Sequence, residues 1–322
     1  MKLLFIFLDG VGLGEDNPVT NPFVRARMPN IEKILGGHRL IANGHHSSTE
    51  SDFYLVKTEC ATLLPLDARL GIEGIPQSAT GQASLLTGIN VSARLGFHEG
   101  PKPTPPIIEL IHNGTLFTQL IEHGRDALLL NAFPPRYFES IEVGYRIPGV
   151  IALSANQAGI PLKTMTDLIE GNAISADFTA SGWRNHLGLI NTPELNNVQA
   201  GERLNRLADT SDLSVFEYWI TDMAGHHQDM QTACSILETL DDVIGSLLNS
   251  WDDQNSLILL TSDHGNLEDL STRHHTLNDV PLLLIGSPKL RELFTDQINS
   301  ARASRSKPDL TDIAPAIINF IG

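Results

Sequence analysis

Continuous apolar runs near both ends of the chain predict buried strands. The first covers residues 3–8, and three more cover residues 213–220, 256–260 and 280–285. Strands that are apolar on both faces are typical of parallel sheets covered by helices on both sides. Residues 230–251 instead carry apolar side chains at the three- and four-residue spacing of an amphipathic helix. The two ends of the chain therefore predict one α/β core.

Three aspartates follow three of these predicted strands. Asp9 comes directly after the first apolar run, Asp222 follows the second and Asp263 follows the third. In open parallel sheets, ligands bind at the edge formed by the carboxyl ends of the strands. We therefore expect the three carboxylates to meet at one edge of the sheet. A last helix is expected over residues 310–318.

The middle of the chain lacks long apolar runs and begins with a proline-rich stretch. It shows no internal repeat, low-complexity tract or long linker. We interpret residues 101–204 as a small inserted cap that sets substrate specificity. Residues 1–100 and 205–322 are then the two parts of a discontinuous catalytic core.

Composition and charge narrow the range of partners. The chain has 22 basic and 38 acidic side chains, which gives a formal charge of −16. A nucleic acid or an anionic membrane is therefore not expected as a partner. The two cysteines, Cys60 and Cys234, lack the spacing of a metal or redox motif. The apolar start ends at Asp9 without a signal-peptide cleavage site. These features predict a cytoplasmic protein.

Histidines close to two of the aspartates provide further metal-binding groups. Asp222 and His226 are four residues apart, so they share one face of a helical turn. Asp263 and His264 are adjacent and can serve one site only where the backbone turns, which Gly265 allows.

A third histidine, His275, lies in a polar loop before the last predicted strand. We expect Thr276 and Asn278 to orient its ring. Imidazole and carboxylate groups without a thiolate are the ligands that borderline divalent metal ions select. The pattern therefore predicts a site for a pair of such ions.

Ser78 is the candidate nucleophile for a reaction at this site. A helix is predicted to start at Gly81, and free N–H groups at a helix start suit a phosphoryl group. A serine hydroxyl needs a metal or a base to activate it, and no base motif lies beside Ser78. Thr80 is the rival nucleophile, and Ser78 alone could be a helix cap.

Six motifs together resemble the alkaline phosphatase superfamily, and within it the branch of cofactor-independent phosphoglycerate mutase and phosphopentomutase. They occur in the order of that family, in roughly the first ninety and the last hundred residues. The motifs are Leu8-Asp9-Gly10-Val11-Gly12, Ser78-x-x-Gly81, Asp222-x-x-Gly225-His226, Asp263-His264-Gly265-Asn266, His275-Thr276-x-Asn278 and Thr311-Asp312-Ile313-Ala314-Pro315.

The resemblance implies an alkaline-phosphatase-like core, with a mostly parallel sheet flanked by helices, and two divalent ions of manganese, zinc or magnesium. It places the Ser78 oxygen beside the second ion and implies a phosphoserine intermediate. It also favours Ser78 over Thr80, because the three-residue offset to the glycine matches the family. The implied ligands are Asp222, His226 and His275 for one ion, and Asp9, Asp263 and His264 for the other.

Two departures limit what carries over from that family. The mutases have a histidine where this chain has Gln82, so the role of that histidine does not transfer. The middle segment matches no substrate motif of the family. Arg94 and His98 are candidate contacts for the substrate phosphate at the edge of the cap.

The predicted function is metal-dependent phosphoryl transfer of the phosphohydrolase type, acting on a small phosphorylated metabolite. The segment between Ser78 and Asp222 is short for the large domain with which the long mutases exclude water, and this favours hydrolysis. A phosphomutase is the alternative, and a non-catalytic metal or phosphate sensor is a further one. A sulfatase is disfavoured because Ser78 lacks the proline and arginine that follow a sulfatase nucleophile.

Overall fold

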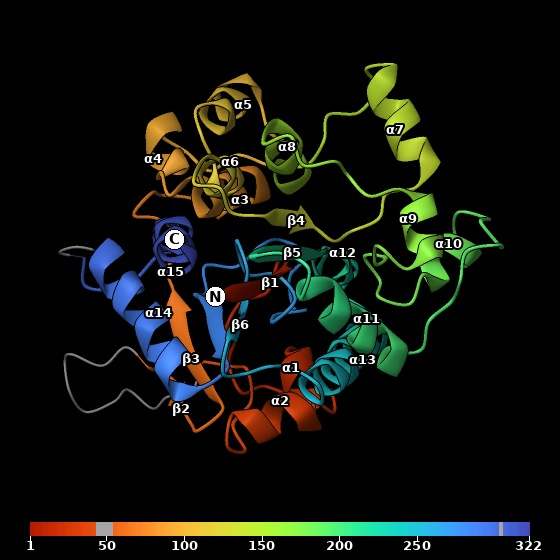
Figure 1. Ribbon diagram of the computed structural model, residues 1–322. Helices are drawn as coiled ribbons and strands as arrows, with labels where there is room; N and C mark the ends of the chain where they lie inside the picture. The colour runs from red at the N-terminus through yellow and green to blue at the C-terminus, as the bar shows by residue number, and fades with distance from the viewer. Residues whose placement is uncertain (43–53, 303–304) are drawn as a thin grey trace.

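A seven-stranded sheet forms the centre of the computed structural model, which describes residues 1–42, 54–302 and 305–322 (Figure 1). The strand order is β2-β3-β7-β6-β1-β5-β4. Strand β1 lies in the middle and pairs in parallel with β5 and β6, and β5 pairs in parallel with β4. The strands are β1 Lys2–Leu8, β2 Val56–Lys57, β3 Ala61–Leu66, β4 Ala127–Leu129, β5 Leu213–Tyr218, β6 Ser256–Thr261 and β7 Val280–Ile285.

The four predicted strands are all present, and the predicted α/β core with a sheet flanked by helices is confirmed, with three parallel and three antiparallel pairings among the described strands. One predicted end was wrong, because β5 stops at Tyr218 and helix α12, Ile220–His227, begins where the strand was expected to continue. One direction also differs from the expectation, since β7 runs antiparallel to β6. Strand β3 pairs antiparallel with β7 and was not predicted.

One face of the sheet is covered by helices that pack on alternate side chains of β1. Leu3, Phe5 and Phe7 point to this face and are buried. Burying one such side chain stabilises the fold by about 1.5–3 kcal/mol. The helices on this side are α3 Ser78–Thr87, α4 Val91–Leu95, α5 Pro105–His112, α6 Leu116–Glu122, α8 Val150–Gln157, α14 Pro288–Ala301 and α15 Ile313–Ile321, the last preceded by the short 3₁₀ helix η1 Leu310–Asp312.

The opposite face receives the other side chains of β1, among them Leu4 and Ile6, which pack in a second apolar cluster. The predicted amphipathic helix is present here as α13, which ends at Leu248 rather than at residue 251. No helix among the described residues combines the length and the hydropathy that a membrane span requires. The helices on this side are α1 Pro22–Arg25, α2 Pro29–Ile34, α11 Asn197–Ala208, α12 and α13 Met230–Leu248.

Residues 101–204, predicted as an inserted cap, have more than one location in the structure. Strand β4 extends the main sheet, and α5, α6 and α8 pack against α3 in the first apolar cluster. Part of this segment therefore belongs to the core, and the core extends beyond residue 100. Helices α7 Pro135–Glu142, α9 Met165–Glu170 and α10 Ser181–Asn185 lie at one side of the molecule (Figure 1). Of these, α9 and α10 share a small apolar cluster of their own.

Candidate metal centre

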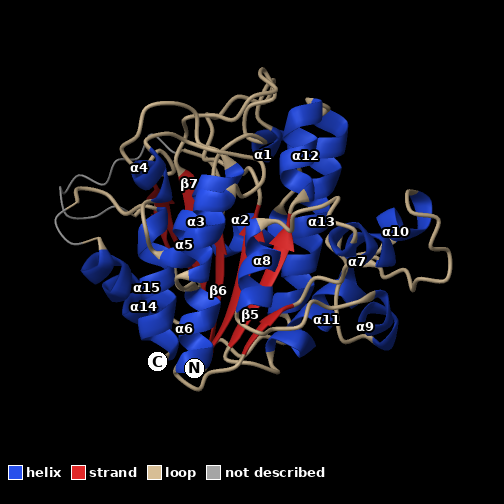
Figure 2. Cartoon of the chain, turned by 90° about the horizontal axis from the view of Figure 1, so that it is seen from above, coloured by secondary structure: helices blue, strands red, loops and turns tan. Residues whose placement is uncertain are grey.

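The three predicted aspartates lie at one edge of the sheet, as expected. Asp9 follows β1, Asp222 lies in the first turn of α12 just after β5, and Asp263 follows β6. Because β5, β1 and β6 are adjacent and parallel, their carboxyl ends meet there. Figure 2 shows the central strands running toward the loop-rich edge beside α12.

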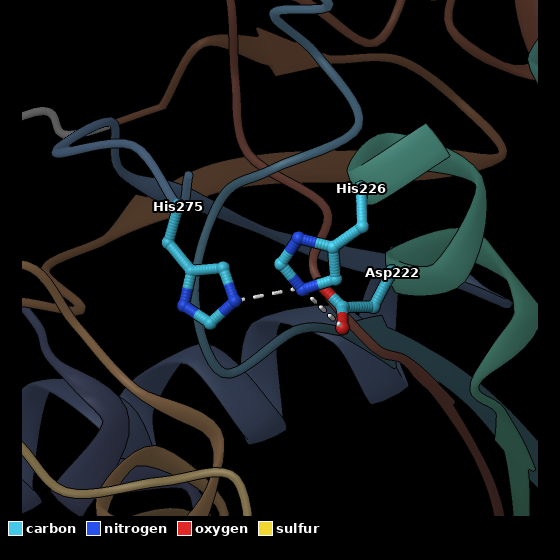
Figure 3. Close-up of side chains that lie close together, drawn as sticks. All are labelled: Asp222, His226 and His275. Atoms are coloured by element: carbon cyan, nitrogen blue, oxygen red, sulfur yellow. Dashed lines mark ion pairs between the residues drawn. The ribbon is translucent and has the colours of Figure 1, made fainter. Parts of the chain in front are cut away.

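The first cluster consists of Asp222, His226 and His275, which point toward one another (Figure 3). His226 Nε2 lies 3.2 Å from one carboxylate oxygen of Asp222, and His275 Nε2 lies 3.6 Å from the other. Asp222 and His226 share one face of α12, which is the geometry that their four-residue spacing predicts.

Hydrogen bonds at the far side of each ring prepare the two histidines to bind an ion. Nδ1 of His226 lies 2.8 Å from the carbonyl oxygen of Arg273, and Nδ1 of His275 lies 2.8 Å from that of Pro76. A carbonyl oxygen can only accept, so each Nδ1 carries a proton, and in the neutral ring each Nε2 then offers a lone pair. Burial, followed by the nearby His264, lowers the pKa of His275, which favours this neutral form.

The second cluster consists of Asp9, Asp263 and His264, and all three are buried. His264 Nε2 lies 3.6 Å from Asp9 Oδ1 and 3.5 Å from Asp263 Oδ2. Burial raises the pKa of Asp9, and Asp263, Asp222 and Glu217 raise it further by charge repulsion. Burial also raises the pKa of Asp263. The candidate ligand oxygens of Asp9 and Asp263 lie within 4.8 Å of each other. Two buried carboxylates this close need a cation between them to stay charged at neutral pH.

The residues of both clusters fit divalent ions. In each cluster the three candidate ligand atoms lie within 4.8 Å of one another. Asp9 Oδ1 is a buried carboxylate oxygen without a hydrogen-bond partner among the described residues. A buried oxygen of this kind is costly unless a cation binds it. The mixture of imidazole and carboxylate groups is that of zinc or manganese sites.

Ser78 lies beside the second cluster and close to the first. Its Oγ is 3.0 Å from His264 Nε2, and the His264 ring stacks on that of His275 with 3.7 Å between centroids. Helix α3 begins at Ser78, so the predicted start at Gly81 was three residues late. The rival Thr80 is buried and donates its hydroxyl to the carbonyl oxygens of Gln77 and Glu99 instead.

The start of α3 also provides backbone donors next to the Ser78 oxygen. The N–H of Thr80 donates to the carbonyl of Glu99, and the N–H of Gly81 donates to that of Gln77. Among the described residues, the N–H groups of Ser78 and its neighbour Ala79 have no hydrogen-bond acceptor, so both are able to donate to a bound anion.

Two glycines allow the elements to approach the centre closely. Gly10 has a φ of +66°, and a Cβ there would lie 2.5 Å from Asp222 Oδ1. Gly81 of α3 packs against the loop after β6, where a Cβ would lie 2.8 Å from the carbonyl oxygen of Asp263. Any larger residue at these positions would push apart the segments that carry the candidate ligands.

Several polar side chains hold the candidate ligands, and sequence reasoning did not assign their roles. Gln82 donates from Nε2 to Asp263 Oδ2 at 3.0 Å, which gives a function to the residue that departs from the mutase pattern. Asn266 donates from Nδ2 to Asp222 Oδ1 at 2.6 Å and so links the loop after β6 to α12.

Glu268 joins three loops of the site through one buried carboxylate. Its Oε2 accepts hydrogen bonds from the N–H of Gly12 at 2.9 Å and of Asn266 at 2.8 Å. Its Oε1 accepts from Asn278 Nδ2 at 3.0 Å and from the hydroxyl of Thr276. Thr276 and Asn278 were expected to orient His275, but their side chains bind Glu268. The only sequence signal for Glu268 was its place two residues after a recognised motif.

The two predicted substrate contacts lie outside the clusters. Arg94 is exposed on α4. Both ring nitrogens of His98 face local partners, with Nδ1 3.0 Å from Ser92 Oγ and Nε2 3.4 Å from the carbonyl oxygen of Ile72. A phosphate contact by either residue stays a prediction.

Comparisons with known proteins agree with this geometry. The family model of the Metalloenzyme superfamily matches residues 162–322. A 2,3-bisphosphoglycerate-independent phosphoglycerate mutase of Methylobacillus flagellatus is 27% identical over 139 residues. That match covers 40% of this chain and 25% of the mutase, so the chain matches about a quarter of the length of this relative.

Two solved structures are similar to nearly the whole chain. The PH0037 protein of Pyrococcus horikoshii has a TM-score of 0.56 at 16% identity, covering 99% of this chain and 96% of that one. The alkaline phosphatase of the Antarctic bacterium TAB5 has a TM-score of 0.50 at 12% identity, covering 99% and 97%. These likenesses show the fold. Together with the family match and the mutase relatives, they confirm the resemblance drawn from the motifs.

Proposed function

Because the chain belongs to the Metalloenzyme superfamily, we propose that it is a metal-dependent phosphoryl-transfer enzyme of the phosphohydrolase type. The proposed substrate is a small phosphate monoester, and the proposed nucleophile is Ser78. The position of the Ser78 oxygen carries the proposal, since it lies 3.0 Å from His264 at the junction of the two candidate ligand sets.

The proposed ligands divide as the two clusters do. Asp222, His226 and His275 would hold one divalent ion, and Asp9, Asp263 and His264 would hold the other. When bound, the ions supply positive charge that stabilises the charge on the phosphate oxygens and on the serine oxygen. An acidic chain with a formal charge of −16 needs such a local source of positive charge to bind a phosphate.

The proposed reaction has two steps at Ser78. The Ser78 hydroxyl releases its proton to water as its Oγ attacks phosphorus, the bond from phosphorus to the alcohol oxygen breaks, and that oxygen takes up a proton from water as the alcohol leaves. Water then attacks the phosphoserine, and phosphate leaves as the Ser78 hydroxyl reforms. The N–H groups of Ser78 and Ala79 at the start of α3 would bind the phosphoryl oxygens in both steps.

Phosphate release from an aryl phosphate tests this function. The protein is loaded with manganese or zinc, and Ser78→Ala is compared with Thr80→Val, which removes a hydroxyl two residues further along α3. The acceptors of the Thr80 hydroxyl have other donors and only the N–H of Glu99 loses its acceptor, at a cost of about 1–3 kcal/mol, so this control should still fold. We expect the Ser78 variant to lose activity and the Thr80 variant to keep it. Equal activity in both variants would contradict the assignment of the nucleophile.

A phosphomutase is the second candidate, and one observation favours it. The matched curated relatives are phosphoglycerate mutases, although each match covers only about a quarter of their length. A mutase would return the phosphoryl group from Ser78 to another hydroxyl of the same substrate and would exclude water. A metal-loaded protein that releases no phosphate but isomerises phosphorylated acids or sugars would establish this alternative. Metal binding with neither activity would indicate a sensor.

A further inference from the structure

A cavity of about 410 Å³ lies beside the start of α3, between two loops. One side of it is lined by Glu73, Gly74, Ile75 and Gln77, and the other by residues 97–100. Neither loop contributes to the two candidate ligand sets, so the cavity is separate from the positions of the proposed ions.

Both loops nevertheless contact the segments of the proposed reaction centre. Gln77 lines the cavity and directly precedes Ser78 at the start of α3. Gly100 lines the other side, where a Cβ would lie 3.1 Å from the backbone nitrogen of Ser78. The carbonyl oxygen of Pro76 binds the ring of His275. Through Gln77 and Gly100 the cavity thus adjoins the backbone of Ser78.

The walls of the cavity combine apolar and acidic side chains. Ile75 and Phe97 are 43% and 52% exposed, a large exposure for apolar groups that are not covered by the chain itself. The carboxylates of Glu73 and Glu99 also line it, and Glu99 is held in place by the hydroxyl of Thr104 at 2.7 Å.

In the part of the chain that the structure describes, the same walls lack positively charged side chains, since none of those that line the cavity is a lysine or an arginine. The one imidazole is that of His98, whose two nitrogens face Ser92 and Ile72, and burial lowers its pKa. An anionic group in this cavity would face two carboxylates without a counter-charge, whereas a cation would be attracted to them and to the Phe97 ring.

We propose that this cavity is the subsite for the alcohol half of the substrate, and that it selects alcohols with a positively charged nitrogen over alcohols with an anionic group. The substrate class is then the phosphate monoesters of amino alcohols. This specificity rests on the proposed phosphoryl transfer at Ser78. It also gives a reason why a phosphorylated carboxylic acid should be a poor substrate.

A matched series of two-carbon phosphates tests the charge selection. 2-Aminoethyl phosphate, 2-hydroxyethyl phosphate and phosphoglycolate differ mainly in the charge at the end away from phosphorus. With manganese-loaded protein, we expect kcat/KM to fall in that order, with at least about a tenfold difference between the first and the last. An exposed charge pair changes affinity by up to roughly fivefold, and here attraction of one substrate adds to repulsion of the other.

Glutamine variants of the two acids connect the selection to the cavity. The ratio of kcat/KM for 2-aminoethyl phosphate to that for phosphoglycolate is measured in the unmodified protein, Glu73→Gln and Glu99→Gln. Comparing ratios cancels differences in leaving-group reactivity and in metal loading. We expect each variant to lower the ratio by roughly fivefold. The control Glu109→Gln removes an exposed carboxylate of α5 outside the cavity and should leave the ratio unchanged.

An aryl phosphate in the same assay distinguishes failure of the proposed subsite from failure of the proposed phosphoryl-transfer function. If Ser78-dependent release from the aryl phosphate occurs and the ratio is the same in all four proteins, the subsite is wrong while the proposed function stands. A preference for phosphoglycolate would have the same consequence. If the metal-loaded protein turns over neither the aryl phosphate nor any member of the series, the proposed function itself fails.

Discussion

Replacing Glu268 provides the sharpest test of how the site is held together. This buried carboxylate accepts four hydrogen bonds, from Gly12, Asn266, Thr276 and Asn278. Two of the donors are backbone N–H groups, and two are side chains that can exchange donor and acceptor roles. In Glu268→Gln, the amide oxygen can keep the two backbone bonds. The new NH₂ group can donate to the hydroxyl of Thr276 and, once the side-chain amide of Asn278 has rotated by half a turn, to its oxygen.

The expected magnitude follows from these bonds. A hydrogen bond to a charged group contributes about 1.5–3 kcal/mol, and one between neutral groups about 1 kcal/mol. Glu268→Gln turns four bonds of the first kind into bonds of the second, so each bond loses about 0.5–2 kcal/mol and the unfolding free energy falls by about 2–8 kcal/mol. Glu268→Ala leaves two buried N–H groups without an acceptor, at a further cost of about 1–3 kcal/mol each. The total loss in Glu268→Ala approaches the whole free energy of unfolding of many proteins, about 5–15 kcal/mol. The glutamine variant is therefore the informative one.

Two assays separate a positioning role from general stabilisation. Denaturant unfolding of the metal-free protein gives the change in stability, and calorimetric titration with manganese at a temperature where both proteins are folded gives the affinity of each site. Because the three loops carry candidate ligands, we expect metal affinity to fall by roughly 10- to 100-fold. The neighbouring Asp269→Asn removes the same charge and can keep the bond from the Ser271 N–H. If Glu268→Gln bound manganese as tightly as the Asp269→Asn control, the proposed positioning role of Glu268 would be refuted.

Three further variants test the clusters themselves. Asp222→Ala removes the only carboxylate of the first cluster, so elemental analysis should find one ion fewer and activity should fall at least about 100-fold with unchanged circular dichroism. Gln82→Leu removes the donor to Asp263 and should weaken metal binding about 10-fold or more, whereas Gln82→His can keep a donor and should lose less. Without metal, burial raises the pKa of Asp263 to about 7, so the folded state holds a proton that the unfolded state releases above about pH 4. The free energy of unfolding should therefore fall as the pH rises from about 4 to about 7. With a chelator present, the thermal midpoint of Asp263→Asn should rise relative to that of the parent protein between about pH 5 and 8. The same pH dependence of the midpoint in the two proteins would contradict this expectation.

The features that could be predicted from sequence are those that local patterns encode. A continuous apolar run such as residues 3–8 predicts a strand buried on both faces, and β1 has this environment. An aspartate after each of three such runs predicts a common edge, because parallel neighbours end on the same side. The histidine at a four-residue spacing from Asp222 predicts a shared helical face. Each inference needs only a short segment and a general rule of α/β folds.

Other features depend on pairings that no short segment contains. The three residues of β4 are too few to show a period, so a strand of the main sheet was assigned to a cap. The apolar run of β7 predicts burial equally well in either direction, and its antiparallel pairing with β6 is set by the connection between them. The start of α3 was placed at Gly81, whereas the extended backbone of Gln77 sets the true start at Ser78.

Glu268 shows why the supporting contacts of a site are harder to predict than its ligands. Ligand identity is a matter of chemistry, since only a few side chains bind divalent ions and their spacing is local. The role of Glu268 depends instead on an acceptor meeting the N–H of Gly12, which is 256 residues away in sequence. In isolation a glutamate predicts a solvated surface position. Its burial follows only from the convergence of the loops after β1 and β6 with the loop before β7, where backbone donors would otherwise lack an acceptor. The same convergence places the candidate ligands, so a glutamate that binds no substrate is expected to matter as much for metal affinity as a residue beside the ions.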